Sequence, residues 1–195
     1  MKLERFLAAR VCLGNLLLGL FALAILVTGI INAASSWAIE TDDDDALPAV
    51  TIIDSNNLQA DGQLSRKTQK PLLILFAMED CAYCEFVEEE HLKPMLRNQD
   101  YLDKVIIRRV MTDDFDDVID FDGTKISSLD FSARYGAYVT PTVVFLNHKG
   151  MELSQRLLGV RNTEFYGGEL DDGLEISLRK LRQQLATAQI ESKSR

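Results

Sequence analysis

The spacing of apolar residues divides the chain into a leader, a polar spacer and one larger domain. Residues 11–34 are almost wholly apolar, whereas residues 40–48 contain a run of four aspartates. After residue 58, short apolar runs alternate with stretches of helical composition, which is typical of an α/β domain. We therefore predict four parts: a signal peptide or membrane anchor (1–38), an acidic linker (39–57), the folded domain (58–190) and a frayed tail (191–195).

Several apolar runs are predicted to form strands. Residues 72–77 are apolar at every position, as expected of a central strand that is covered on both faces. Residues 105–110 and 142–146 are rich in β-branched residues, which favour strands. The other predicted strands are a short one at 49–54 and one at 151–158, which returns after a turn at 147–150 and ends at Gly159.

Helices are predicted between these strands. The stretch 82–92 is rich in good helix formers, and Pro94 behind it is expected to kink the helix or to open a second short turn. Residues 111–126 contain six aspartates but lack the spacing and the terminal Glu of an EF-hand, so we predict a solvated loop there. The other predicted helices are 58–68, 128–135 (capped by Ser128 and ended by Gly136) and 170–189.

The first 38 residues have the pattern of an export signal. Lys2, Arg5 and Arg10 precede the apolar run, and small residues near Ala38 suit a signal peptidase, so we expect cleavage after Ala38. The alternative is an uncleaved anchor, because the apolar run approaches the length that spans a bilayer. In both cases the positive charge ahead of the run leaves the domain outside the cytoplasm. We therefore predict a periplasmic or other extracytoplasmic location, with membrane contact only through this segment.

The net charge narrows the range of partners. It is −9 for the whole chain, and −11 once the three positive and one negative charges of residues 1–38 are removed. An acidic protein is repelled by the phosphates of nucleic acid and by an anionic membrane surface. We therefore predict neither nucleic-acid binding nor docking to lipid headgroups.

Cys81 and Cys84 are the only cysteines of the predicted domain, since the third, Cys12, lies in the leader. They stand where a buried strand gives way to a helix. A thiol at the start of a helix faces unpaired N–H groups and the positive end of the helix dipole, and both stabilise the thiolate. One sulfur can therefore attack a partner disulfide, and the other can resolve the mixed disulfide that forms. The pattern predicts a redox-active Cys81–Cys84 disulfide and no other cofactor.

Other roles for the cysteine pair remain open at this point. A CxxC can be half of a zinc site, but zinc needs four ligands and the only histidines are His91 and His148. A structural disulfide is a weaker hypothesis, because such a short ring stabilises a fold little. The protein could also be an envelope copper chaperone that uses Cys81, Cys84 and His148, or a non-catalytic binding module that uses a groove beside Pro141.

The order of the predicted elements resembles the thioredoxin fold, an α/β fold with a central mixed β-sheet flanked by helices. The matching residues are 73–76, the Cys81-Ala82-Tyr83-Cys84 motif and the stretch 139–145, which contains Thr140-Pro141-Thr142. The chain is most similar in appearance to exported thioredoxin-like proteins of the sulfur-oxidation (SoxW-like) type. That similarity extends to residues 159–160 and 165–167, and the whole resemblance covers roughly residues 58–188.

The resemblance implies a function and a set of site residues. Cys81 would be the attacking thiolate and Cys84 the resolving thiol, with a cis Thr140–Pro141 bond beside the sulfurs. Tyr83, Thr140 and Pro141 would contact the substrate, and the backbone of residue 140 would pair with an extended substrate chain. The protein would reduce or isomerise disulfides of envelope proteins, and a membrane thiol donor would recharge it.

The chain also departs from the family pattern. Asp80 stands where thioredoxins carry Trp, Ala82 and Tyr83 replace Gly-Pro, and Leu75 occupies the place of a buried Asp. The proton relay that this Asp serves is therefore either missing or assigned to another carboxylate, with Glu79 and Glu85 as candidates. Acidic residues around Cys81 disfavour its thiolate, so we expect a reductant or isomerase rather than a strong oxidant.

Overall fold

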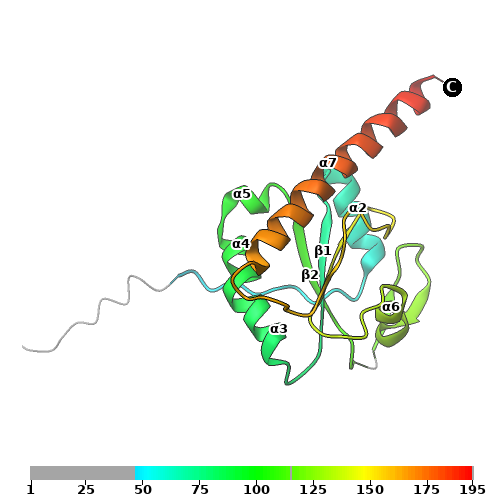
Figure 1. Ribbon diagram of the computed structural model, residues 1–195. Helices are drawn as coiled ribbons and strands as arrows, with labels where there is room; N and C mark the ends of the chain where they lie inside the picture. The colour runs from blue at the N-terminus through cyan, green and yellow to red at the C-terminus, as the bar shows by residue number, and fades with distance from the viewer. Residues whose placement is uncertain (1–46, 115, 195) are drawn as a thin grey trace, which may run out of the picture. The chain divides into compact units, whose positions relative to one another are not determined.

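The computed structural model describes residues 47–114 and 116–194 of the chain (Figure 1). The predicted signal peptide or anchor (1–38) and residues 39–46 of the predicted acidic linker lie outside these residues. Within the described part of the chain, no helix combines the length and the apolar character needed to cross a membrane.

A four-stranded mixed sheet forms the centre of the domain, in the order β2-β1-β5-β6. Strand β1 (Leu72–Ala77) runs parallel to β2 (Ile106–Met111) and antiparallel to β5 (Thr142–Leu146), and β6 (Leu157–Leu158) pairs with β5. All six residues of β1 are buried, as predicted for a central strand. The strand predicted at 49–54 is reduced to one bridge between Asp54 and Arg109, with backbone hydrogen bonds to both sides of it.

Helices cover both faces of the sheet, because successive side chains of a strand point to opposite faces. Leu73, Leu75 and Ala77 pack in one apolar core with residues of α3 (Ala82–Val87), α4 (Lys93–Arg97) and α7 (Tyr166–Lys193). Leu72, Ile74 and Phe76 pack in a second core with residues of α2 (Leu58–Thr68) and α6 (Ser128–Arg134). This arrangement confirms the predicted α/β fold with a mixed sheet between helices (Figure 1).

The helix behind the cysteines is interrupted by a π-helical segment, η3 (Glu88–Leu92), before it continues as α4 and the short α5 (Gln99–Leu102). In this segment the N–H of Lys93 bonds to the carbonyl of Glu88, five residues back. Pro94 has no N–H to give to the carbonyl of Glu90, and its ring clashes with a regular turn at that point. A wider turn removes this conflict. The predicted break at Pro94 is therefore a π-helical turn on its N-terminal side.

The loop predicted at 111–126 is wrong in part, because it contains a small hairpin. Strand β3 (Asp117–Ile119) pairs with β4 (Lys125–Ser127), and Val118 is buried beneath the neighbouring helix α6. The alternating pattern spans only three residues per strand, too few to stand out among the aspartates. The helix cap is also shifted by one residue: the side chain of Ser127, not Ser128, accepts the N–H of Asp130.

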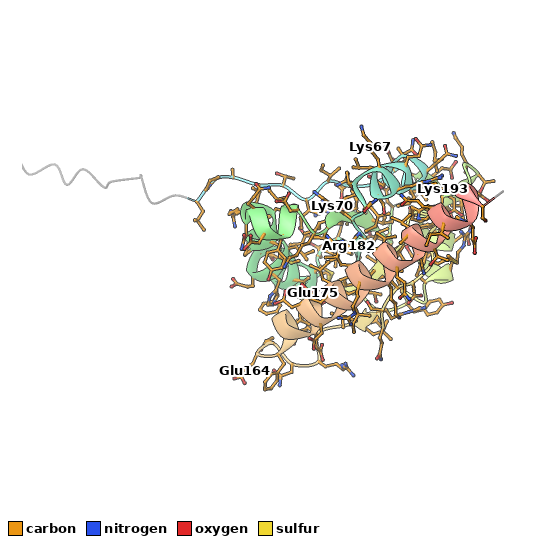
Figure 2. All side chains as sticks on the ribbon, turned by 90° about the horizontal axis from the view of Figure 1, so that it is seen from above. Lys67, Lys70, Glu164, Glu175, Arg182 and Lys193 are labelled. Atoms are coloured by element: carbon orange, nitrogen blue, oxygen red, sulfur yellow. A yellow bond between two sulfur atoms is a disulfide. The ribbon has the colours of Figure 1, made fainter. Side chains whose placement is uncertain are left out.

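Two further predictions near the C-terminus need correction. The returning strand predicted at 151–158 is limited to a bridge at Glu152 and to β6. Helix α7 begins at Tyr166 and ends at Lys193, so most of the tail predicted to fray is helical. Charged side chains follow the outer part of this helix, from Glu175 through Arg182 to Lys193 (Figure 2). Its buried residues end at Leu181, and the last turns extend past the sheet (Figure 1).

Candidate redox site

The cysteine pair forms a disulfide at the first turn of α3. The S–S distance is 2.09 Å, and Cys81 is the N-cap residue of the helix. Its sulfur accepts the backbone N–H of Cys84 at 3.1 Å, and its carbonyl accepts the N–H of Glu85 at 3.0 Å. Cys81 is partly exposed, whereas Cys84 is 3% exposed. An incoming group can therefore reach the sulfur of Cys81 far more easily than that of Cys84.

Pro141 lies at the same edge of the sheet as the disulfide. Strand β1 ends at Ala77, four residues before Cys81. Because Phe76 pairs with Thr142 in the antiparallel register, the next position places Pro141 beside Ala77. The Thr140–Pro141 peptide bond is cis, and the carbonyl of Pro141 accepts the N–H of Gly159 at 2.8 Å. The sheet thus brings two segments about 60 residues apart in the sequence to one edge.

Exposed aromatic and apolar side chains belong to these two segments. Tyr83, within the cysteine motif, is 58% exposed. Tyr138 and Val139, directly before Thr140, are 81% and 56% exposed. Large apolar side chains left in solvent at a site are typical of surfaces that contact another molecule. Of the predicted substrate-contacting residues, Tyr83 is exposed, Thr140 is half-buried and Pro141 is buried.

The surroundings of Cys81 are acidic. Glu79, Asp80 and Glu85 are exposed around the turn, and the backbone N–H of Glu79 donates to the carboxylate of Asp113 at 2.9 Å. This contact adds a carboxylate from a different loop. Glu79 and Glu85, the predicted relay candidates, both point to solvent and lack the buried setting that such a role needs.

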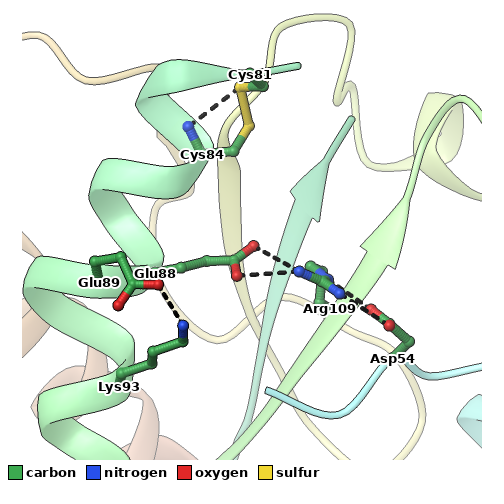
Figure 3. A network of polar contacts seen from close by, with 7 residues as sticks. All are labelled: Asp54, Cys81, Cys84, Glu88, Glu89, Lys93 and Arg109. Carbon is green, nitrogen blue, oxygen red and sulfur yellow. Dashed lines mark hydrogen bonds and ion pairs between the residues drawn. A yellow bond between two sulfur atoms is a disulfide. The ribbon is translucent and has the colours of Figure 1, made fainter. Parts of the chain in front are cut away.

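A part-buried carboxylate is supplied instead by Glu88 (Figure 3). The sequence indicated Glu88 only as one of the acidic residues near Cys81, not as a relay candidate. Its side chain is 13% exposed, and both of its oxygens accept hydrogen bonds at 3.0 Å from Nη1 of Arg109 on β2. The same guanidinium donates to Asp54 from Nε at 2.6 Å and from Nη2 at 2.9 Å. The hydrogen bonds to Asp54, followed by those to Glu88, raise the pKa of Arg109, whereas burial opposes them. A signal for this network was present in the sequence: Arg108 and Arg109 interrupt an otherwise apolar strand.

The structure does not bring His148 to the cysteines. Leu146, just before the turn that holds His148, pairs with Leu72 at the start of β1, whereas the disulfide follows the end of that strand. Burial lowers the pKa of His148, and its Nδ1 has no hydrogen-bond partner among the described residues. The predicted copper site of Cys81, Cys84 and His148 is therefore not assembled.

His91 is also unsuited to a shared metal site with the cysteines. It packs between Phe86 and Tyr166, with ring centroids 5.3 Å apart in each pair, and burial lowers its pKa although Glu90 and Asp171 act in the opposite direction. In the part of the chain that the structure describes, no group of three or more His, Cys, Asp or Glu side chains is placed to hold a metal ion.

Comparison with known proteins agrees with this geometry. The family of thioredoxin-like domains matches residues 58–172, which is more than half of the chain, and the chain therefore belongs to that family. The match does not extend to the SoxW-like type or to export, which remain predictions. Comparison with curated proteins gives no match.

Several solved structures are similar in fold. Mitochondrial thioredoxin 3 from Saccharomyces cerevisiae in its oxidized form is 22% identical, with 64% of this chain and 93% of that chain covered and a TM-score of 0.40. A poplar thioredoxin h mutant is 17% identical over 69% and 92% of the two chains, with a TM-score of 0.46. A thioredoxin-fold protein from Helicobacter pylori is 20% identical over 61% and 86%, with a TM-score of 0.39.

Proposed function

We propose that the protein is a thiol–disulfide oxidoreductase of the cell envelope that reduces or isomerises disulfides of partner proteins. One observation carries this proposal: the Cys81–Cys84 disulfide caps a helix with its outer sulfur accessible and Pro141 at the same edge of the sheet. Membership of the thioredoxin-like family supports the chemistry. The export pattern of residues 1–38 supports the location.

The reduced protein would act in two exchanges. In the first, the Cys81 thiolate attacks one sulfur of a partner disulfide; a bond forms between the two proteins, and the second partner sulfur leaves as a thiolate. In the second, Cys84 loses its proton and attacks the sulfur of Cys81. The mixed disulfide breaks, the Cys81–Cys84 bond forms, and the partner sulfur leaves. Two electrons pass to the partner, whose two thiolates each take up a proton.

The partner chain would bind in extended form across this edge. The backbone of Thr140 would pair with it as one strand pairs with the next, and Pro141 would lie beneath the reacting sulfurs. Tyr83 would supply an exposed aromatic face against the bound chain. Backbone pairing does not depend on the side chains of the partner, so this way of binding suits an enzyme with several client proteins.

The location implies a source of electrons. Outside the cytoplasm the cytosolic thiol pools are absent, so a membrane thiol donor would reduce the Cys81–Cys84 bond after each cycle. Cell fractionation, with the mass of the mature chain, tests this part of the proposal. Recovery of the uncleaved protein in the cytosol would overturn the location without affecting the chemistry.

The chemistry is tested by reduction of the disulfides of insulin. We expect the dithiol-coupled turnover of the wild-type protein to fall to the uncatalysed background in Cys81→Ser, because the attacking sulfur is lost. Cys12→Ser is the matched control, since it removes a thiol outside the domain, and its turnover should equal that of the wild type. Turnover in Cys81→Ser near that of the wild type would refute the mechanism.

A further inference from the structure

A network of three charged side chains lies beneath the disulfide (Figure 3). Glu88 extends from the helix that carries the cysteines, Arg109 stands on β2, and Asp54 comes from the segment that pairs with β2. The three groups connect three separate parts of the chain. Two carboxylates share one guanidinium, so the network carries a net charge of −1 when both are ionised.

Glu88 is on the same helix face as Cys84, one turn further on. The carbonyl of Cys84 accepts the backbone N–H of Glu88, and side chains four residues apart on a helix are neighbours. Both residues are largely buried, at 3% exposure for Cys84 and 13% for the side chain of Glu88. Arg109 is the register partner of Leu75, which packs in the same core as Cys84.

Burial makes these charges more effective than those on the surface. Charges act over longer distances where water is excluded, and a nearby negative charge disfavours ionisation of a thiol whereas a positive charge favours it. Asp54 is 58% exposed, so solvent screens its effect. Glu79, Asp80 and Glu85 around the turn are exposed as well. Within the network, Glu88 and Arg109, at 13% and 25% side-chain exposure, are therefore the less exposed charges, and they lie on the inner side of the cysteine helix.

We propose that Glu88 and Arg109 are positioning residues that set, with opposite signs, how readily the Cys84 thiol ionises in the reduced protein. Arg109 holds the carboxylate of Glu88 below Cys84. The carboxylate keeps Cys84 protonated, while the Cys84 N–H that points at the Cys81 sulfur favours ionisation of Cys81. The two thiols thereby differ in how readily they ionise, and Cys81 is the one that attacks first. This order of attack rests on the proposed function, but the ionisation of Cys84 does not.

The test is a pH titration of the Cys84 thiolate by its ultraviolet absorbance, in the full chain. The chain carries Cys12→Ala and Cys81→Ala, which leave Cys84 as its one thiol. We expect Glu88→Gln to lower the titration midpoint by about one pH unit and Arg109→Gln to raise it by about one unit. Arg109→Lys keeps the charge, and its midpoint should stay close to that of the parent.

Glu89→Gln is the matched control. Glu89 is the next residue of the same helix, but it is 48% exposed and pairs with Lys93, so removing its charge should leave the midpoint unchanged. A merely structural role for the network would move Glu88→Gln and Arg109→Gln in the same direction and would also affect Arg109→Lys. That result would overturn the proposal. An unchanged midpoint in every variant, as expected for Glu89→Gln, would overturn it as well. If Arg109→Gln does not fold, Glu88→Asp takes its place: it keeps the charge, so its midpoint should stay close to that of the parent while Glu88→Gln shifts, whereas a structural role would move both.

The titration involves no partner disulfide, so its outcome is separate from the proposed function. If the protein reduces insulin but the Glu88 and Arg109 variants do not shift the Cys84 midpoint in opposite directions, only the proposed role of these two residues is disproved. Opposite shifts without insulin reduction would leave the electrostatic role in place and remove the oxidoreductase.

Discussion

At the scale of single residues, the two sulfur atoms of the disulfide occupy different environments. Cys81 is partly exposed, caps a helix and accepts a backbone N–H, whereas Cys84 is buried above the Glu88–Arg109 pair. The side chains of Glu79, Asp80 and Glu85 around Cys81 are exposed carboxylates, and Asp113 from another loop accepts the backbone N–H of Glu79. The helix start stabilises the thiolate of Cys81 and these carboxylates oppose it. The balance decides in which direction electrons flow.

This balance predicts a reducing rather than an oxidising pair. A strong oxidant such as DsbA, at about −120 mV, owes its potential to a stabilised reduced form, and acidic neighbours work against that. Equilibration with glutathione buffers should therefore give a clearly more negative potential. Glu79→Gln removes one opposing charge and should raise the potential by roughly 10–30 mV, whereas Glu191→Gln, at the far end of α7, should not change it. A wild-type potential as oxidising as that of DsbA would contradict this reading.

Residue identity and spacing were enough to predict the cysteine pair and the Thr-Pro position. Both belong to short motifs in which neighbouring residues carry the information, namely a CxxC after an apolar strand and a Pro before a β-branched one. The Glu88–Arg109–Asp54 network could not be predicted in this way. Its members come from three separate parts of the chain. The pairing of residues 53–55 with β2 brings Asp54 to Arg109, and the packing of the cysteine helix on the sheet brings Glu88.

At the scale of elements, the bounds of the helices and strands show where tertiary packing changes what the local sequence pattern predicts. The first helix and the central strand have the predicted bounds, because their apolar patterns and flanking residues agree. The hairpin β3–β4 was missed because its few apolar residues, Val118, Ile119 and Ile126, lie among aspartates. Packing of α7 against the sheet extends that helix beyond its predicted start. Tertiary contacts, which a periodicity argument does not include, account for these differences.

Helix α7 packs tightly against Phe145 of β5 at Gly173, which gives a prediction for stability. A Cβ there would lie 2.5 Å from the ring of Phe145, whereas a Cβ at Gly168 in the same helix meets nothing within 4 Å. Overpacking costs about 1–3 kcal/mol, and Ala gains about 1 kcal/mol over Gly in a helix. Urea unfolding should therefore show Gly173→Ala less stable than wild type by about 1 kcal/mol and Gly168→Ala more stable by about 0.5–1 kcal/mol. Equal stabilisation in both variants would show that the helix does not pack as described.

At the scale of the whole molecule, sheet topology determines which residues can act together. The antiparallel pairing of β1 with β5 places Pro141 at the edge where the disulfide lies and the turn of His148 at the opposite edge. Element order in the sequence predicted the first of these placements through the resemblance to thioredoxins. The position of the His148 turn could be known only from the register of β1 with β5. This position rules out a copper site made of Cys81, Cys84 and His148. The described residues therefore provide one accessible sulfur (Cys81), its buried partner (Cys84) and the exposed side chains of Tyr83, Tyr138 and Val139.

The measurement closest to the central claim is the capture of partners by Cys84→Ser in the native cell. Without the resolving sulfur, Cys81 should remain bonded to its clients, and mass spectrometry of non-reduced extracts should find complexes that a reductant releases. The double variant Cys81→Ser with Cys84→Ser is the control for bonds through Cys12. We predict client proteins of the envelope with Cys84→Ser and none with the double variant. Absence of reductant-sensitive complexes, or equal amounts of them in both variants, would contradict the account.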